Sequence, residues 1–221
     1  MFGCMLSVII PACNEENYLK ETIESVKKQN LKSCEIIVIS DGSLDKTDKI
    51  SAEYADKFLR LEKRQGPAAA KNAGARIARG EILVFLDADT HMTERVLEEI
   101  EKVCKNNVVG TCQISPSKNS FKNKMFMTLK NHLLCPLGVS NGILFCTKKT
   151  FDEYGGYNPL LKKREEGDFL RKIKSSGNFI ILKNKVISST RRFDQLGYSK
   201  VISYWIGEAL KPSDKDYPLI R

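Results

Sequence analysis

Short apolar runs and helical stripes of apolar residues alternate along the first half of the chain. Apolar runs bounded by turn residues predict strands, here over residues 6–10, 35–39, 58–61, 82–86 and 108–114. Apolar residues that recur every three or four positions predict amphipathic helices, here near residues 18–28, 45–54, 67–80 and 93–103. This order predicts an α/β fold with a mostly parallel central sheet and helices on both faces.

The second half has a mixed pattern. Phe121, Met125 and Leu129 follow one another at every fourth position and predict a helix. Further strands are predicted over 142–147 and 179–182, with a helix over 165–176 and an amphipathic helix over 200–210. Since there is no internal repeat and no low-complexity linker, we expect one continuous domain over residues 1–221.

The composition is that of a globular protein, with 42% hydrophobic and 29% charged residues. The net charge of +9 is compatible with anionic substrates, but no aromatic-interleaved or recognition-helix pattern accompanies it, which disfavours nucleic acid as a partner. The seven cysteines contain no C-x-x-C pair, so we expect reduced thiols and no zinc site.

No apolar run is long enough to span a bilayer, and the first residues lack the basic segment of a signal peptide. These features predict a cytoplasmic protein. The amphipathic basic tail around Trp205 would allow peripheral contact with the inner membrane surface.

Two carboxylates follow the strand predicted over 82–86, in the sequence Asp87-Ala88-Asp89. Ligands of open α/β sheets bind beyond the carboxyl ends of the strands. Carboxylates at that edge favour a hard divalent cation, and such a cation favours a diphosphate. An isolated pair of this kind is more often only a turn, so the argument depends on the neighbouring loops.

Polar loops also follow the first two predicted strands. Asn14 can donate to and accept from a base or ribose, Asp41 can accept from a base N–H, and the small residue Ala12 lets a flat ring approach the backbone. No G-x-G-x-x-G and no P-loop sequence is present. The phosphates of a bound nucleotide would therefore need carboxylate-bound metal and basic side chains, for which Lys71, Arg191, Arg192 are available.

With these loops taken together, the chain resembles the family 2 glycosyltransferases, which have a GT-A fold. The resemblance covers residues 6–195 and rests on the following segments: Ser7-Val8-Ile9-Ile10-Pro11-Ala12-Cys13-Asn14-Glu15, Asp41-Gly42-Ser43, Gly66-Pro67-Ala68-Ala69-Ala70-Lys71-Asn72-Ala73-Gly74, Asp87-Ala88-Asp89, Gly155-Gly156-Tyr157, and Glu165-Glu166-Gly167-Asp168-Phe169. It implies a nucleotide-binding half over 1–114, an acceptor and catalytic half over 115–195, and a helical tail over 196–221.

The resemblance also implies roles for individual residues. Asp41 would bind the base, and Lys71 would lie against the nucleotide. Asp87 would hold the ribose or sugar, and Asp89 would bind Mg²⁺ or Mn²⁺. The residues expected to line the nucleoside pocket or to lie near the donor phosphates are Pro11, Ala12, Asn14, Glu15, Arg191 and Arg192.

The motif that supplies the general base departs from the family pattern in this chain. The family uses the aspartate of a Glu-Asp pair, whereas this chain has Glu165-Glu166, so that Glu166 falls on the base position. Asp168 is the alternative base. All three acids could instead be an acidic first helical turn that favours the helix dipole.

We therefore expect a metal-dependent, inverting glycosyltransferase that uses a nucleotide-diphospho-sugar such as a UDP- or GDP-sugar. The resemblance does not identify the acceptor, which could be a glycan, a lipid or a small molecule. The alternatives are a nucleotidyltransferase, which usually has a glycine-rich loop after its first strand, and a degenerate sugar-nucleotide-binding protein without turnover.

Overall fold

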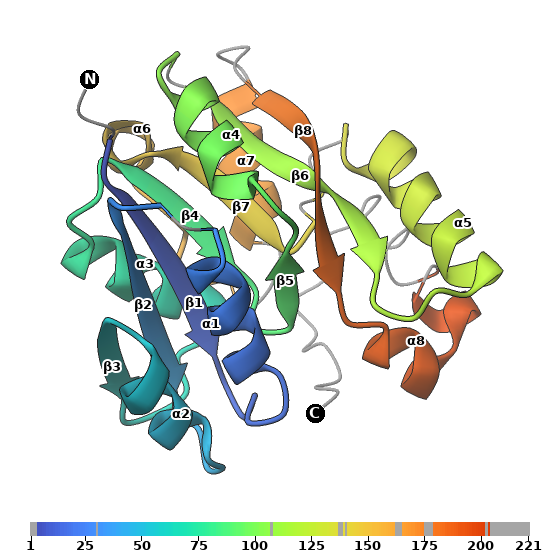
Figure 1. Ribbon diagram of the computed structural model, residues 1–221, viewed down its shortest axis with the longest axis horizontal. Coiled ribbons are helices and arrows are strands. Elements are labelled where there is room, and N and C mark those ends of the chain that lie inside the picture. The colour runs from blue at the N-terminus through green and yellow to red at the C-terminus, as the bar shows by residue number, and fades with distance from the viewer. Residues whose placement is uncertain are drawn as a thin grey trace.

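One eight-stranded sheet forms the centre of the molecule in the computed structural model, which describes residues 4–29, 31–106, 108–136, 139, 141–161, 165–174, 179–201 and 203. The strand order is β3-β2-β1-β4-β7-β6-β8-β5 (Figure 1). The strands are β1 (Leu6–Ala12), β2 (Cys34–Asp41), β3 (Lys57–Leu61), β4 (Ile82–Leu86), β5 (Thr90–Met92), β6 (Val109–Pro116), β7 (Ile143–Thr147) and β8 (Phe179–Ser188).

The first four strands are parallel, as the sequence predicts. β1 lies between β2 and β4, and β3 pairs with the outer side of β2. All five residues of β4 are buried, which fits its central position. The carboxyl ends of β1, β2 and β4 therefore meet at one edge of the sheet, where the polar loops follow.

The second half makes the sheet mixed. β7 runs antiparallel between β4 and β6, β8 is parallel to β6, and β5 is antiparallel to β8. β8 returns the chain to β5, which directly follows the Asp87-Ala88-Asp89 turn. Both halves of the chain thus contribute to the same edge.

Helices cover both faces of the sheet, and Figure 1 shows α1, α2 and α4 in front of it, α3 and α7 behind it, and α5 and α8 beyond β6 and β8. The helices are α1 (Leu19–Lys27), α2 (Thr47–Tyr54), α3 (Pro67–Ile77), α4 (Val96–Cys104), α5 (Phe121–Leu129), α6 (Lys148–Glu153), α7 (Glu165–Lys174) and α8 (Arg191–Leu196), and a π-helical turn, η1 (Lys130–Leu134), continues α5.

The alternation of side chains along the buried strands divides the core into two layers. On β1, Leu6, Val8 and Ile10 pack towards α1 and α4, whereas Ile9 packs towards α3 with Ile37 of β2. Every one of these side chains is fully buried. The mostly parallel centre with helices on both faces is thus confirmed.

Several local predictions were wrong. Thr93 does not cap α4: Gln29, in the turn after α1, accepts from the backbone N–H groups of Val96 and Leu97, while the Thr93 hydroxyl donates to Lys185 O. A distant side chain thus takes the cap that the local sequence assigned to Thr93. α3 ends at Ile77 rather than near Gly80, and β5, α6 and α8 were not predicted.

The helix predicted over 200–210, with Trp205, lies largely outside the described residues. In the part of the chain that the structure describes, no helix combines the length and the apolar character needed to cross a membrane.

Glu35 of β2 ties three strands together at the edge opposite the candidate site. One of its carboxylate oxygens accepts from Ser7 Oγ and from the backbone N of Arg79, each at 2.7 Å, and Lys57 Nζ lies 3.0 Å from the other oxygen. Burial opposes ionisation of this carboxyl group, but these donors and the Lys57 charge outweigh it and lower its pKa to about 2.

We expect Glu35→Gln to destabilise the fold by about 2–3 kcal/mol at pH 7. Because the pKa of Glu35 falls from 4.5 to about 2 on folding, its contribution is complete above pH 4.5 and is lost as the pH falls towards 2. Urea unfolding at a series of pH values would measure this. The exposed Glu53→Gln is the control, and equal losses for both variants would contradict the role of Glu35.

Candidate active site

The Asp87-Ala88-Asp89 turn is fixed by backbone hydrogen bonds from separate parts of the chain. Asp87 N donates to Gly142 O at 2.9 Å, and the Thr22 hydroxyl donates to Ala88 O at 2.8 Å. Ser189 N, after β8, donates to Asp89 O at 3.1 Å. Two carboxylates are therefore held at the carboxyl end of β4 on a rigid support.

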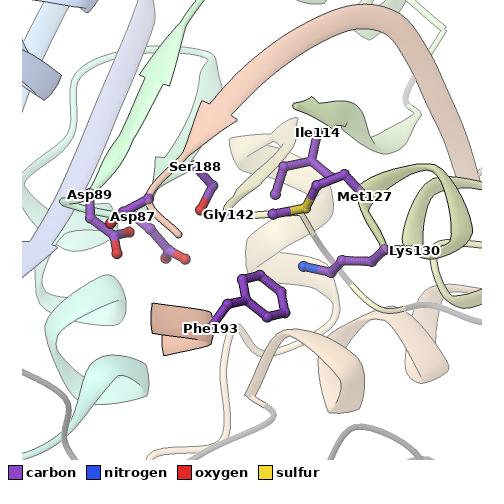
Figure 2. Close-up of a pocket in the computed structure, with 9 residues that line it drawn as sticks. Asp87, Asp89, Ile114, Met127, Lys130, Gly142, Ser188 and Phe193 are labelled. Carbon is purple, nitrogen blue, oxygen red and sulfur yellow. The ribbon is translucent and has the colours of Figure 1, made fainter. Parts of the chain in front are cut away.

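A small pocket of about 60 Å³ lies beside these carboxylates. Figure 2 shows Asp87 and Asp89 on one side of it, with the Lys130 amine pointing in from the other side. The remaining lining residues are Ile114, Met127, Gly142, Ser188, Ser189 and Phe193. Gly142 has φ +79°, and a Cβ there would lie 2.7 Å from Thr90 Oγ1, so glycine is needed at this wall.

Arg191 at the start of α8 closes the other side of the acidic turn. Its guanidinium makes two hydrogen bonds to the Glu15 carboxylate, at 2.7 and 2.8 Å, and lies 3.0 Å from Asp89 Oδ2. It also stacks over the Tyr18 ring, 4.8 Å from the ring centroid. Burial raises the pKa of Glu15 even though Arg191 opposes this shift. The site thus places one cation against two carboxylates.

The loops after β1 and β2 are pinned to each other. Asn14 adopts φ 56°, and its side-chain oxygen accepts from Leu44 N at 2.7 Å. Glu15 N donates to the Thr47 hydroxyl at 2.8 Å. The predicted pocket residues Pro11 and Ala12 form the end of β1 directly before this loop. The residues expected to line the nucleoside pocket therefore lie in and before one loop. Glu15 connects this loop to Asp89, because Arg191 contacts both carboxylates.

Asp41 lies at the end of β2, and its side chain is buried. Its two carboxylate oxygens accept from the backbone N of Gln65 at 2.6 Å and of Gly66 at 2.8 Å, where α3 begins. These bonds orient the loop before α3. The predicted role of Asp41 in base recognition stays a prediction.

Lys71 of α3 is 2% exposed and lies between two carboxylates of α7. Its Nζ is 2.8 Å from Glu165 Oε1 and 2.5 Å from Glu166 Oε1, and it lies 5.4 Å from the Tyr157 ring centroid. Burial raises the pKa of Glu166 to about 7, with Asp87 and Glu165 adding to the rise and Lys71 opposing it. A carboxyl group with this pKa is suited to take up a proton near neutral pH.

Asp168 occupies a different environment. Its carboxylate is 3.1 Å from Lys172 Nζ and 3.7 Å from Arg171 Nη2, both on the same helix. Such pairs, three and four residues apart, are typical of a charged helix surface. Of the two candidate bases, Glu166 is therefore the one that is held by an ion pair to the buried Lys71 of α3.

The sequence did not point to Met127 or Lys130 as pocket residues. They come from α5 and η1, and no spacing in the sequence relates them to Asp87. Arg191 was predicted, but its pairing with Glu15 was not. Arg192 lies in α8, and its side chain is outside the described part of the structure.

The donor set fits a cation that is only partly coordinated by protein. Among the described residues, no group of three or more His, Cys, Asp or Glu side chains is arranged to hold a metal ion. Asp87 and Asp89 supply carboxylate oxygens, which suit Mg²⁺ or Mn²⁺ when substrate phosphates and water complete the coordination. Asp89 is at present paired with Arg191, so a cation and the guanidinium would compete for it.

Comparisons with known proteins agree with this arrangement. The family profile described as "Glycosyl transferase family 2" matches residues 7–165. An uncharacterized glycosyltransferase of Haemophilus influenzae is 36% identical over 113 residues, which cover 48% of this chain and 45% of that protein. A dolichyl-phosphate beta-glucosyltransferase of Trichomonas vaginalis is 34% identical over 146 residues, which cover 58% of this chain and 45% of that protein. The chain thus spans less than half the length of both relatives.

Solved structures share the fold. A mannosyltransferase from Pyrobaculum calidifontis, in complex with GDP-Man and Mn²⁺, has a TM-score of 0.71 and 16% identity, covering 95% of this chain and 63% of its own. TarS from S. aureus, in complex with UDP-GlcNAc, has a TM-score of 0.69 and 21% identity, covering 85% of this chain and 59% of its own. The profile match spans well over half of the chain, and the chain therefore belongs to glycosyl transferase family 2, with the GT-A fold.

Proposed function

We propose that this protein transfers a sugar from a nucleoside-diphosphate sugar to an acceptor hydroxyl, with inversion at the anomeric carbon and dependence on Mg²⁺ or Mn²⁺. The observation that carries the proposal is the pair Asp87 and Asp89, which line a pocket at the carboxyl end of β4. The GDP-Man and UDP-GlcNAc complexes of the neighbouring structures support a nucleotide-sugar donor. The acceptor stays open.

In this proposal Asp89, with Asp87 beside it, holds the divalent cation. That cation, when bound, offsets the negative charge that develops on the departing nucleoside diphosphate. The loop that carries Asn14 and Glu15 provides the nucleoside side of the pocket, since it is braced against the loop after β2. A nucleotidyltransferase usually has a glycine-rich phosphate loop after its first strand, and the sequence after β1 has no such loop.

Glu166 is the proposed general base. Its carboxylate takes the proton of the acceptor hydroxyl as that oxygen attacks the anomeric carbon, and the bond to the diphosphate breaks. Lys71 is a positioning residue, because it holds Glu166 by an ion pair and keeps part of the Glu166 population ionised. Glu165 also pairs with the Lys71 ammonium group, and this weakens the attraction between Lys71 and Glu166.

Arg191 is proposed to change partners when the donor binds. With a divalent cation held by Asp89, the guanidinium would be available to pair with a phosphate oxygen of the donor. The bidentate pair with Glu15 keeps Arg191 close to the site in the meantime.

The proposal is tested first by donor binding. We expect Mn²⁺ together with one nucleotide from a panel of UDP, GDP, dTDP and CMP to raise the melting temperature. A ligand held at about 100 times its Kd adds about 2.7 kcal/mol to the stability. Asp89→Ala should remove the shift, because the metal ligand is lost. Absence of a shift with every nucleotide would contradict the donor site.

Glu166→Gln should reduce the transfer rate by a factor of about 100 or more while nucleotide binding persists. It should also stabilise the fold by about 1–3 kcal/mol at pH 8. Because the pKa of Glu166 rises from 4.5 to about 7 on folding, its ionisation opposes folding above pH 4.5, and the gain should vanish below that pH. Transfer assays and urea unfolding at pH 4.5 and 8 measure both effects.

Asp168→Asn is the matched control for this experiment, since it neutralises an acid on the same helix. We expect it to retain most of the transfer activity. Loss of activity in Asp168→Asn with activity retained in Glu166→Gln would reverse the assignment of the base. Nucleotide binding without turnover in the unaltered protein, across donors and acceptors, would favour the degenerate binding protein.

Arg191→Gln should tighten binding of Mn²⁺ in the absence of nucleotide by about fivefold, since the competing charge on Asp89 is removed. Titration calorimetry with Mn²⁺ alone measures this. Lys118→Gln is the control, because Lys118 pairs only with Asp194 among the described acids near α8. Unchanged or weaker Mn²⁺ binding in Arg191→Gln would contradict the competition.

A further inference from the structure

A stripe of apolar side chains on α5 and η1 faces the solvent. The stripe residues are Phe121, Met125, Leu129 and Leu133, one every fourth position, and they are 83%, 53%, 49% and 54% exposed. Figure 1 shows α5 at the outside of the molecule, beyond β6. The apolar face that the sequence predicts on this helix is therefore turned away from the core.

Polar side chains on the opposite face of the helix hydrogen-bond to the rest of the protein. Asn123 is buried, donates to Lys118 O at 2.9 Å and accepts from the Tyr198 hydroxyl at 2.5 Å. Asn131 bonds the backbone N and O of Ile114 on β6 at 2.8 and 3.0 Å. Rotating the helix to bury the stripe would break these bonds, so the exposure of the stripe is part of the fold.

The exposed apolar side chains are concentrated in the stripe rather than scattered over the surface. Seven large apolar side chains are exposed among the described residues, and four of them form this stripe. Single exposed apolar residues are normal on a soluble protein, whereas a contiguous apolar patch marks an interaction surface. The other three exposed residues are Leu44, Ile77 and Leu160.

The charge around the stripe indicates the chemistry of its partner. Lys122 and Lys124 are exposed on α5 itself. The sequence from residue 102 to residue 151 contains eight lysines and no Asp or Glu. One of the eight, Lys118, is paired with Asp194 of α8. An apolar stripe flanked by lysines, on a segment that carries no acid of its own, matches an anionic lipid surface, into which the apolar side chains insert while the lysines meet the headgroups.

We propose that the stripe residues of α5 and η1, together with Lys122 and Lys124, dock the protein on the surface of an anionic bilayer. The same helical segment lines the pocket through Met127 and Lys130. A docked membrane would therefore lie next to this pocket. This docking goes beyond the proposed transfer reaction and is testable without turnover.

The test is co-sedimentation of the full chain with vesicles of phosphatidylcholine alone or with 30% phosphatidylglycerol. We expect binding to the anionic vesicles only. Phe121→Ser/Leu129→Ser should weaken it at least tenfold, because two inserting side chains are lost. Lys122→Gln/Lys124→Gln should weaken it by about fivefold per lysine, with a smaller effect at high salt.

Matched controls distinguish this surface from general stickiness. Leu160→Ser removes an exposed leucine elsewhere, and Lys27→Gln/Lys28→Gln removes two exposed lysines of α1. Both should bind vesicles as the unaltered protein does. Far-ultraviolet circular dichroism shows whether each variant is folded, and a nucleotide-dependent melting shift reports separately on the donor site.

Two results would overturn the proposal. The first is equal vesicle binding by the folded stripe variant and the unaltered protein, or no preference for anionic vesicles. The second is an oligomer, detected by light scattering, that dissociates in the stripe variant while vesicles are not bound. That outcome would assign the stripe to contact between copies of this chain.

Discussion

The buried ammonium of Lys71 is the contact on which the geometry of the site depends. It joins α3 of the first half to Glu165 and Glu166 of α7, 94 and 95 residues further along the chain. A charge at this depth is stable only when it is paired. The register of α7 against the sheet is therefore constrained, and this constraint brings Glu166 to the same end of β4 as Asp87.

Arg191 makes the corresponding contact on the other side of the acidic turn. The carboxylates around the site are Glu15, Asp87, Asp89, Glu165 and Glu166, and the cations Lys71 and Arg191 pair with four of them. Crowding of like charges and burial raise the pKa values of Glu15 and Glu166. Such a surplus of negative charge is what a divalent cation would offset, and it connects the electrostatics of the protein to the proposed chemistry.

The α5 helix shows how a polar contact can override an apolar pattern. An apolar residue at every fourth position normally marks the core-facing side of a helix. Here Asn123, Met127 and the following Asn131 lie on the inward side of the helix. The hydrogen bonds of Asn123 and Asn131 to the neighbouring strand and loops satisfy buried polar groups. The apolar stripe is left outside, beside the pocket, where it is free to serve as an interface.

The sequence by itself determined the strand and helix order of the first half apart from β5, the carboxyl-end edge with Asp87 and Asp89, and the family. These follow from local periodicity and from short motifs whose residues are near one another in the chain. Only the tertiary structure decided the pairing of Arg191 with Glu15, the competition of Glu166 and Glu165 for Lys71, the capping of α4 by Gln29 and the outward face of α5. Each of these features depends on groups that are distant in sequence. A buried charge or polar group pairs with the neighbour that the fold brings next to it, and no local pattern encodes that neighbour.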